Sequence, residues 1–567
     1  FAICETGFGL GLSFLDSWAA WQADPQRSTR LHFVSCELHP FTRDDLRQLH
    51  ARLFADQPTL LALSRELLAS WPPLMAGSHR IELAGGQVVL TLLFGDAMDC
   101  LCNLAGKFDA FYLDGFAPAK NPDLWQLPLF KQLARLVADQ ASIASYTVAG
   151  EVRRALQAAG FVVEKRAGFA GKRHCLGGVF RGKRPPATVP ARHAIVIGAG
   201  LAGAAISERL AQRGWQISLL ERHAAPAQEA SGNHAGAYRP VVALDDNLQA
   251  RLARAAFLYG LRQFRQLPGL IWQACGAVQL ARDADEQAKL QQIAAAPWPA
   301  DYLQWLERDA ASALAGKPLA SGGLWFAQAG WVKPTSLVHA LLAKAGKAIS
   351  TQFGATVSAL HHDGQHWQAL DDSGTVLASA PVLILANAAD AMRFAPELGL
   401  SADERVVSLL AGAADPAVRT VVCGGAYLTP AHDGLAALGS SPASPTALAD
   451  NLALLGNMLP QVKQATDTPM AWRQCARPNS IDRLPLVGPL VDSSRWQPKY
   501  AGSLHLAPRR TGLFALTGFG ARGLVWCNLL AELLASQICG EPLPLERDLV
   551  NALDPARFLA RHGATSP

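Results

Sequence analysis

The segment that most restricts the fold of this chain is a complete strand–helix–strand unit beginning at residue 193. An apolar run over residues 193–197 predicts a buried strand that leads directly into the glycine loop Gly198-Ala199-Gly200-Leu201-Ala202-Gly203. A helix, a turn at Gly214 and a second strand over residues 217–221 follow, and this strand ends on Glu221. In dinucleotide-binding folds, such glycines let the backbone approach a pyrophosphate, and the acid binds a ribose. The segment therefore predicts an α/β domain with a dinucleotide site.

Two further small-residue segments favour FAD as the dinucleotide. Residues 230–237 form a second loop, and residues 516–524 form a glycine cluster that precedes a helix with an apolar face. A helix N-terminus directed at a flavin ring stabilises the anionic reduced form. The alternative for the last cluster is an ordinary packing turn. The residues predicted to bind FAD are Gly198, Ala199, Gly200, Leu201, Ala202, Gly203, Glu221, Arg222, Ser231, Gly232, Asn233, Gly236, Val357, Gly518, Gly520, Ala521, Gly523 and Leu524.

A different glycine loop opens the chain. A strand ends on Glu5 and is followed by Gly7-Phe8-Gly9-Leu10-Gly11, and Glu37 and Asp96 come at the ends of two later strands. A strand-end acid can accept hydrogen bonds from a ribose diol, and Asp96 suits an adenine contact. This pattern fits S-adenosylmethionine better than NAD, whose loop is usually G-x-G-x-x-G. It predicts a class I, Rossmann-like methyltransferase domain; the alternative is an α/β domain without a nucleotide. The predicted donor-binding residues are Glu5, Gly7, Phe8, Gly9, Gly11, Glu37, Asp96 and Ala97.

Asp114 ends a fourth expected strand, over residues 108–113, and precedes a loop rich in Gly, Pro and Asn that runs to Trp125. In open α/β sheets, ligands bind beyond the carboxyl ends of the strands. Asp114 is therefore a candidate catalytic acid or base. The alternative is that it caps the N-terminus of a helix.

A basic, proline-rich segment divides the chain. Residues 181–192 predict an exposed linker between a methyltransferase domain at 1–180 and an FAD-binding, Rossmann-type domain at 193–567 that includes a mixed α+β substrate subdomain. The first residue, Phe1, lies inside an expected strand and is not Met. We therefore expect an N-terminal segment to be missing, so that targeting cannot be read from this end.

The amino-acid composition bears on the kind of partner, on metal binding and on the cellular location. The 567 residues carry a formal net charge of +5, which permits an anionic partner without requiring one. No apolar stretch reaches the ~18 residues of a membrane span. The ten cysteines lack metal-ligand or disulfide spacing, which indicates a reduced, cytoplasmic protein without a metal. A monomer is favoured, although nothing in the sequence addresses oligomeric state.

Basic residues cluster near the end of the first domain. As phosphate contacts they would make nucleic-acid binding salt-dependent, and the alternative is ordinary solvated charge. The cluster consists of Lys165, Arg166, Lys172, Arg173, His174, Arg181, Lys183 and Arg184.

The order of these motifs resembles that of the bacterial bifunctional tRNA 5-methylaminomethyl-2-thiouridine biosynthesis proteins, over nearly the whole chain. The resemblance lies in residues 5–9, 114–125, 198–203, 230–233 and 520–524. Against the family pattern, Leu10 replaces Thr, Ser13 replaces Asn, Ala521 replaces Ser, and the aromatic Tyr238 is displaced by one position.

The resemblance implies two reactions on the wobble uridine of tRNA. The second half, similar to glycine and D-amino-acid oxidases, would use FAD to oxidise the amine of a carboxymethylaminomethyl group, and hydrolysis would leave an aminomethyl group. The first half would methylate that amine from S-adenosylmethionine. Asp114 would accept the amine proton, and Arg522 would hold the carboxylate. The methyl-transfer substrate would contact Phe116, Pro118, Lys120, Asn121, Trp125, Lys172 and Arg173.

The sequence also leaves other functions open. An oxidase of free amino acids fused to a small-molecule methyltransferase is one alternative, and a non-catalytic binding module is another. Arg477 and Arg483 flank Asp482 and would be either substrate contacts or its salt-bridge partners. The candidates for the oxidase substrate are Tyr238, Arg239, Arg477, Asp482, Arg483 and Arg522.

Overall fold

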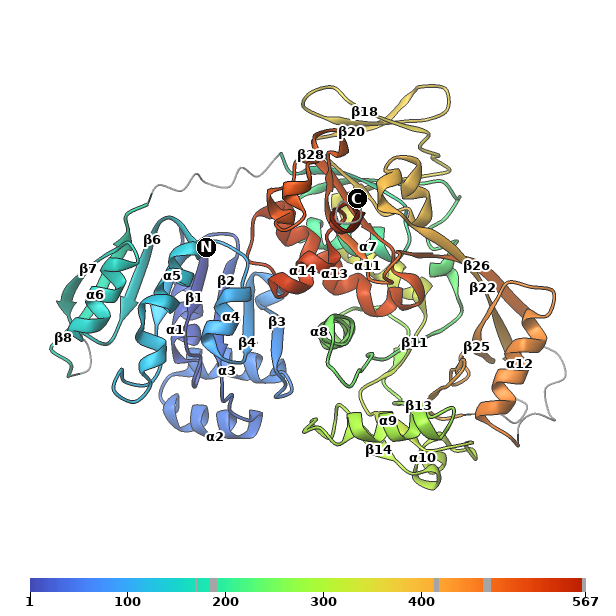
Figure 1. The fold of residues 1–567 in the computed structure, drawn as a ribbon, viewed down its shortest axis with the longest axis horizontal. Helices are drawn as coiled ribbons and strands as arrows, with labels where there is room; N and C mark the ends of the chain where they lie inside the picture. Colours follow the sequence, from blue (N-terminus) through green and yellow to red (C-terminus); the bar gives the residue numbers. More distant parts are fainter. Residues whose placement is uncertain (169–170, 183–190, 412–417, 462–470, 563–567) are drawn as a thin grey trace. The chain divides into compact units, whose positions relative to one another are not determined.

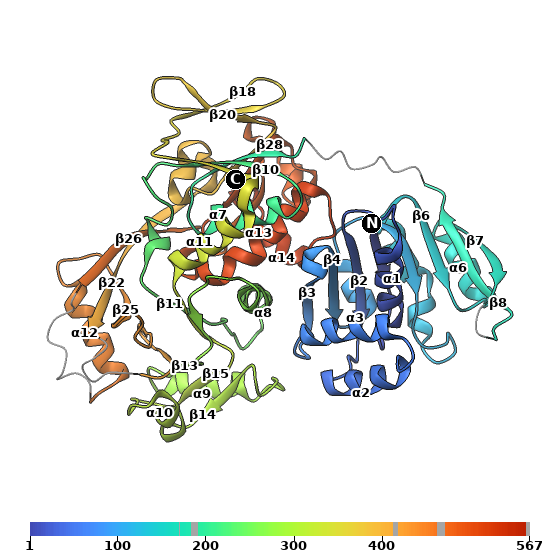
Figure 2. The same ribbon diagram turned by 180° about the vertical axis from the view of Figure 1, so that it is seen from behind.

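The computed structural model describes residues 1–168, 171–182, 191–411, 418–461 and 471–562. The chain forms two compact units, which Figures 1 and 2 show from opposite sides. The first comprises residues 1–189 and 536–550, and the second comprises residues 190–535 and 551–567. Most of the expected linker, residues 183–190, lies outside the described residues. None of the helices in the described ranges is long and apolar enough to cross a membrane.

The first unit is built on an eight-stranded sheet with the order β3-β4-β2-β1-β5-β6-β8-β7. The five strands from β4 to β6 are parallel, and β3, β8 and β7 join in antiparallel pairs. The strands are β1 (Ala2–Glu5), β2 (Leu31–Glu37), β3 (Gly77–Leu83), β4 (Val88–Phe94), β5 (Phe108–Leu113), β6 (Val137–Ser145), β7 (Phe161–Ala167) and β8 (His174–Phe180). The predicted strand over residues 108–113 is confirmed as β5.

Helices cover both faces of this sheet. Alternate residues of β1 therefore pack in two different hydrophobic cores. Ile3 packs in a cluster with Phe14 of α1, whereas Ala2 and Cys4 pack in a cluster with Phe130 of α5. The helices are α1 (Leu12–Ala23), α2 (Arg43–Leu53), α3 (Pro58–Ala69), η1 (Ala84–Gly86), α4 (Ala97–Asn103), η2 (Pro122–Trp125), α5 (Leu127–Leu136) and α6 (Gly150–Ala158).

The carboxyl ends of four neighbouring strands carry the acids singled out in the sequence. Glu5 and Glu37 are the last residues of β1 and β2, Asp96 comes two residues after β4, and Asp114 directly follows β5. Since these strands are adjacent and parallel in the order β4-β2-β1-β5, the four acids lie along one edge of the sheet.

The second unit contains a six-stranded sheet, β17-β10-β9-β21-β28-β27, in which only the β27–β28 pair is antiparallel. Its strands are β9 (His193–Ile197), β10 (Gln216–Glu221), β17 (Ile349–Phe353), β21 (Val382–Leu385), β27 (Leu486–Val491) and β28 (Arg509–Thr517). Helices α7 (Leu201–Ala211), α11 (Pro334–Ala345) and α13 (Gly523–Cys539) accompany it. The predicted strand–glycine loop–helix–strand unit is confirmed as β9-α7-β10.

Glycines at the β9–α7 turn are required by close backbone approach. Gly198 has φ +100°, and a Cβ there would lie 2.8 Å from the carbonyl oxygen of Ala386. A Cβ on Gly203 would lie 1.8 Å from the carbonyl oxygen of Gly198, so only glycine lets α7 begin this close to β9.

A second, mixed sheet in this unit forms the expected α+β subdomain, with the order β14-β15-β13-β23-β24-β25-β22-β26. Its strands are β13 (Ala277–Leu280), β14 (Gln304–Leu306), β15 (Gly323–Phe326), β22 (Ser401–Ala411), β23 (Val421–Cys423), β24 (Tyr427–Leu428), β25 (Leu435–Pro442) and β26 (Ala471–Asn479). Two three-stranded sheets comprise β11 (Gly236–Tyr238), β12 (Trp272–Gln273) and β16 (Gly330–Val332), and β18 (Ala359–His362), β19 (Trp367–Leu370) and β20 (Val376–Ala380). The remaining α-helices are α8 (Leu248–Arg265), α9 (Ala284–Ala294), α10 (Arg308–Ala315), α12 (Ala447–Met458), α14 (Arg547–Leu553) and α15 (Arg557–His562). Short 3-10 turns include η3 (Ala230–Gly232), η5 (Ala388–Arg393) and η10 (Gly520–Arg522).

Candidate active sites

The first glycine loop is held by hydrogen bonds with two neighbouring segments, β2 and α2. The Gly9 amide donates to the Glu37 carboxylate at 2.8 Å, and the Phe8 amide donates to the Cys36 carbonyl oxygen at 2.9 Å. His50 of α2 lies with Nε2 2.8 Å from the Leu10 carbonyl oxygen, so this nitrogen carries the proton and donates. A Cβ on Gly9 would meet no atom within 4 Å, which leaves open space beside the loop.

Glu5 is buried beneath this loop and accepts a hydrogen bond from the Ser35 hydroxyl at 2.7 Å. Burial raises the pKa of the Glu5 carboxyl to about 8, and the nearby Asp114 and Glu37 carboxylates raise it further, against hydrogen bonds from Ser35 and Ser13. Three carboxyl groups therefore surround the loop closely enough to interact. Such a cluster is stabilised by a positively charged ligand, which fits the sulfonium and ammonium groups of S-adenosylmethionine.

Asp96 and Ala97 lie where β4 passes into α4. Asp96 is the N-cap of α4, and its Oδ1 accepts hydrogen bonds from the amides of Met98 at 2.8 Å and Asp99 at 3.2 Å. Asp96 is exposed at the sheet edge, and Ala97 is buried. The capping bonds orient this carboxyl group beside the position predicted for adenine.

Asp114 is exposed, and its Oδ1 accepts a hydrogen bond from the amide of Gly115 at 2.7 Å. The next helical turn, η2, begins only at Pro122 with Asn121 as its N-cap. The interpretation of Asp114 as a helix cap is therefore wrong, and its carboxyl group faces solvent at the strand end.

Aromatic side chains support the loop after Asp114. Phe116 is 71% exposed, whereas Trp125 is buried and its indole nitrogen donates to the Phe116 carbonyl oxygen at 2.9 Å. Tyr146, which follows β6, donates from its hydroxyl to the Gly115 carbonyl oxygen at 2.8 Å. Sequence reasoning missed Tyr146, although a polar aromatic residue at the end of the next strand was a usable signal. Of the other predicted substrate residues, Lys120 is exposed and Pro118 and Asn121 are half-buried.

The predicted basic cluster is partly within the described residues. Lys165 and Arg166 lie on β7, and Lys172 and Arg173 precede β8; all four side chains are exposed. Arg166 pairs with Glu164 at 3.0 Å. The Lys172 ammonium lies 4.1 Å from the centre of the Tyr146 ring. Lys183 and Arg184 fall outside the described residues.

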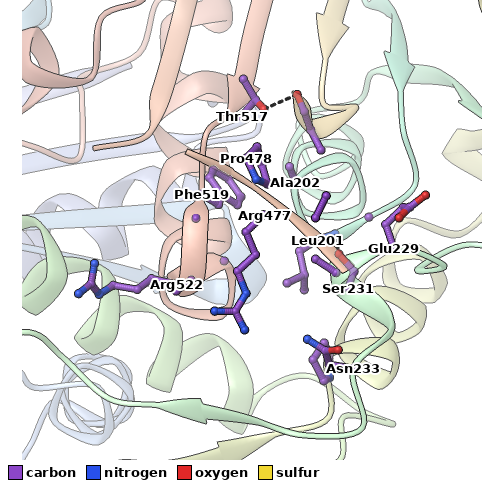
Figure 3. A pocket seen from close by; sticks show the side chains of 18 of the residues that line it. Leu201, Ala202, Glu229, Ser231, Asn233, Arg477, Pro478, Thr517, Phe519 and Arg522 are labelled. Carbon is purple, nitrogen blue, oxygen red and sulfur yellow. Dashed lines mark hydrogen bonds between the residues drawn. The ribbon is translucent and has the colours of Figure 1, made fainter. Parts of the chain in front are cut away.

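The second unit contains a cavity of about 740 Å³ at the β9–α7 turn, and Figure 3 shows part of its lining. Glu221 accepts a hydrogen bond from the Ala199 amide at 2.7 Å, and the Ser231 hydroxyl accepts one from the Leu201 amide at 3.0 Å. The buried Oδ1 of Asn387, another lining residue, has no hydrogen-bond partner among the described residues. An elongated cavity formed by several loops, with a helix N-terminus and an unsatisfied polar atom, fits a dinucleotide such as FAD.

Most of the residues predicted to bind FAD line this cavity, including Val357 and the cluster around Gly520. The described lining residues do not include Ala199, Gly203 and Gly232. A Cβ on Gly232 would lie 2.4 Å from the Arg473 guanidinium and 2.5 Å from the Ala227 carbonyl oxygen. Gly203 and Gly232 are therefore needed for close packing behind the cavity rather than for its wall.

Among the arginines that line the cavity are three of the candidates for the oxidase substrate, Arg239, Arg477 and Arg522, and Figure 3 shows the last two. Burial lowers the pKa of the Arg522 guanidinium, and the neighbouring cations Arg239 and Arg483 lower it further. Within the described part of the chain, none of these three lining arginines forms a salt bridge. The cavity thus presents uncompensated positive charge, which favours an anionic ligand.

Two of the oxidase candidates have structural roles instead. Asp482 pairs with Arg557 at 2.8 Å, a partner that the sequence did not indicate. Tyr238 is 1% exposed, and its hydroxyl donates to the Phe257 carbonyl oxygen at 2.9 Å. Tyr238 is therefore a core residue beneath the cavity, since it packs against α8 rather than lining the wall.

Family comparisons agree with the two sites. A family model described as S-adenosyl-L-methionine-dependent methyltransferase matches residues 58–181, and one described as FAD dependent oxidoreductase matches residues 193–537. The fold and both sites therefore define a methyltransferase joined to a flavin-dependent oxidoreductase, with S-adenosylmethionine and FAD as the cofactors.

Relatives with both parts match along nearly the full length. The tRNA 5-methylaminomethyl-2-thiouridine biosynthesis bifunctional protein MnmC of Azoarcus sp. (strain BH72) is 50% identical over 100% of this chain and 91% of its own length. The protein of the same name from Aromatoleum aromaticum is 49% identical over 99% and 90%. The chain belongs to the family of these bifunctional proteins.

Solved structures share the fold of the oxidoreductase class. Glycine oxidase from Geobacillus kaustophilus has a TM-score of 0.51 at 21% identity and covers 65% of this chain and 99% of its own. L-Proline dehydrogenase from P. horikoshii has a TM-score of 0.53 at 14% identity and covers 66% and 99%. These likenesses concern the fold alone.

Proposed function

We propose that this protein carries out two successive steps of wobble-uridine modification in tRNA. The second unit removes the carboxymethyl group from 5-carboxymethylaminomethyl(-2-thio)uridine, and the first unit methylates the resulting amine. The observation that carries the proposal is the arginine-lined cavity of the second unit, because its positive charge favours an anionic ligand beside a dinucleotide. The product of such an oxidation is the amine that the first unit would use. From the tRNA substrate we infer a cytoplasmic location, and we propose that the protein acts as a monomer.

In the oxidation, the substrate amine loses a proton and its neighbouring carbon loses a hydride, which gives a C=N bond that water then cleaves to glyoxylate and the primary amine. FAD, when bound, supplies the acceptor for that hydride. The guanidinium groups of Arg522 and Arg477 hold the substrate carboxylate, since guanidinium binds carboxylate through two parallel hydrogen bonds. Their positive charge also disfavours the ammonium form of the substrate, and the neutral amine is the form that reacts.

In the methyl transfer, the nitrogen lone pair of the primary amine attacks the methyl carbon of S-adenosylmethionine, and the sulfonium leaves as a thioether. An ammonium has no free lone pair, so Asp114 accepts the proton and holds the nitrogen in line with the methyl group. The bond from the Gly115 amide to Asp114 Oδ1 fixes the orientation of this carboxyl group. The Glu37 carboxylate favours the cationic donor over its neutral product, and Glu5 adds to this effect in its ionised form.

The substrate side of the methyl-transfer site suits an RNA. Phe116, Pro118, Lys120 and Asn121 form the loop after Asp114, and the exposed Lys172 and Arg173 are available for phosphate contacts.

The test is the mass of the wobble nucleoside after FAD-loaded protein acts on tRNA bearing 5-carboxymethylaminomethyluridine. Without S-adenosylmethionine the aminomethyl nucleoside should accumulate, and with it the methylaminomethyl nucleoside should form. Asp114→Asn should stop at the aminomethyl stage, and Asp123→Asn, an exposed acid in the same loop, should complete both steps. Unchanged tRNA with the wild type contradicts the function. Near-wild-type methylation by Asp114→Asn removes Asp114 from the role of base.

A further inference from the structure

Tyr146 is joined to the loop that carries Asp114. Its hydroxyl donates to the Gly115 carbonyl oxygen at 2.8 Å, and its ring meets the Trp125 ring edge-on, at a centroid distance of 5.8 Å and an angle of 89°. Trp125 in turn donates to the Phe116 carbonyl oxygen at 2.9 Å. These two aromatic residues therefore fix the two residues that follow the catalytic acid.

Tyr146 also lies close to the Asp114 carboxyl group. Burial raises the pKa of the Tyr146 hydroxyl, and the charge of Asp114 raises it further. The hydroxyl thus stays protonated and keeps its donor role, and the ring is half-buried.

The charged group of Lys172 lies over one face of the Tyr146 ring. The Lys172 ammonium lies 4.1 Å from the Tyr146 ring centre, and the Lys172 side chain is exposed. At exposed sites such a contact is weak and easily exchanged for another partner. Lys172 also has the exposed Arg173 beside it.

The segment that contains Lys172 has a marked excess of positive charge. Residues 150–182 contain seven Lys or Arg and two acids, an excess of five, which equals the formal net charge of +5 of all 567 residues. An aromatic ring with a cation on its face, inside such a region, has the chemistry that binds single-stranded nucleic acid: stacking for a base and positive charge for the backbone.

We propose that Tyr146 is the stacking platform for the RNA base that is methylated, and that Lys172 leaves the ring to contact an adjoining phosphate. The base then lies against the ring with its 5-substituent directed to Asp114. A phosphate is a stronger partner for an ammonium than a tyrosine ring, so base and phosphate together replace the cation–ring contact. This inference rests on the proposed RNA substrate and identifies where its reacting base binds.

The test compares two anticodon stem-loop RNAs, one with uridine at the wobble position and one with an abasic residue there, by fluorescence anisotropy. For the wild type, loss of the base should weaken binding about tenfold, the usual scale of one base–aromatic stack. In Tyr146→Leu the two RNAs should bind equally, because the partner of the base is gone. Tyr146→Phe keeps the ring and should discriminate as the wild type does.

The salt dependence of RNA binding tests the role of Lys172 separately. Lys172→Ala should lower the slope of log affinity against log salt by about one, as loss of one phosphate contact does. The chain offers a matched control pair, because Lys499 lies 5.2 Å over the Tyr500 ring in the second unit. Tyr500→Leu and Lys499→Ala should leave both measurements unchanged.

The outcomes separate the two proposals. A wild type that binds neither RNA at low salt overturns the RNA substrate and the platform with it. A wild type that binds both RNAs equally, or a Tyr146→Leu variant that still prefers the RNA with the base, overturns the platform alone. An unchanged salt slope in Lys172→Ala removes Lys172 from the phosphate.

Discussion

The Thr6 hydroxyl donates a hydrogen bond to the backbone carbonyl oxygen of Asp114, with 2.7 Å between the two oxygens. Thr6 stands between Glu5 and Gly7, and its amide donates to the Tyr112 carbonyl oxygen at 3.2 Å. The loop proposed to bind the methyl donor is thus tied to the strand end that carries the proposed base. Because methyl transfer needs both groups in line, this bond links donor position to acceptor position.

Replacement of Thr6 by Val should slow methyl transfer without affecting the oxidase. Val keeps the shape of Thr but removes the hydroxyl, so the Asp114 carbonyl oxygen loses a bond worth about 1 kcal/mol. We expect kcat for methylation to fall by about fivefold on that scale, and Thr6→Ser to restore it. Steady-state methylation of aminomethyl-tRNA measures the effect. An equal loss of oxidase activity would instead indicate a general folding defect.

Glu5 predicts a pH-dependent stability of the ligand-free protein. Its buried carboxyl has a pKa raised to about 8, whereas in the unfolded chain a Glu ionises near 4.5. Between these values the native state holds the proton more tightly, so raising the pH lowers the free energy of unfolding, by at most about 1.4 kcal/mol per pH unit from this group. The stabilising effect of the proton is complete below pH 4.5 and lost above pH 8.

Glu5→Gln cannot ionise and should abolish this contribution. The difference in Tm between Glu5→Gln and the wild type should therefore grow in favour of the variant from pH 5 to pH 8 in calorimetry without ligands. Glu151→Gln, which changes an exposed acid on α6, is the control and should track the wild type. Parallel pH profiles for Glu5→Gln and the wild type would contradict the buried, protonated state.

Replacing Arg522 should have opposite effects on substrate binding and on the stability of the ligand-free protein. Removing its charge with Arg522→Met should raise the KM of the oxidase about tenfold to a hundredfold, the scale of hydrogen bonds to a charged group. The same change should raise the Tm of the ligand-free protein, because burial and the cations Arg239 and Arg483 disfavour this guanidinium. Oxidase kinetics, thermal unfolding and methylation of aminomethyl-tRNA are the three measurements, and methylation should not change.

The exposed Arg495 provides the comparison, since Arg495→Met alters the same residue type outside the cavity lining. An unchanged oxidase KM in Arg522→Met would leave Arg477 as the main carboxylate contact. The Arg477→Met variant would then carry the large effect.

Local sequence patterns were enough for the strands and turns that build the two cofactor sites. The run from Phe108 to Leu113 is apolar because β5 is central in a parallel sheet, and Gly198 is glycine because its φ is +100°. Each of these signals lies within a few residues of the feature it specifies. That is why β5 and the β9-α7-β10 unit could be predicted without knowledge of the rest of the fold.

Contacts between distant segments could not be predicted in this way. Residues 536–550 belong to the first unit, where the Ser78 hydroxyl donates to the Pro544 carbonyl oxygen at 2.7 Å and Arg30 pairs with Glu541 at 3.1 Å. Nothing in the periodicity of this C-terminal segment distinguishes it from its neighbours in α13. For Tyr146, the position after β6 was a local signal, but the hydrogen bond that gives it a role joins it to a loop 31 residues earlier.

Glu532 of α13 makes a buried ion pair that supports the helix of the dinucleotide site, and its loss should be costly. It is 0% exposed and accepts a hydrogen bond at 2.8 Å from Arg213, a residue just after α7 whose side chain is 2% exposed. Glu532→Leu would remove the buried carboxylate that pairs with Arg213, and breaking a buried ion pair in this way usually costs about 3–5 kcal/mol. The exposed Arg308–Asp309 pair should contribute less than about 1 kcal/mol, so Asp309→Leu is the control. Thermal unfolding, monitored by the release of bound FAD, should give clearly different Tm values for the two variants. Equal Tm values for the two would show that Arg213 finds another partner.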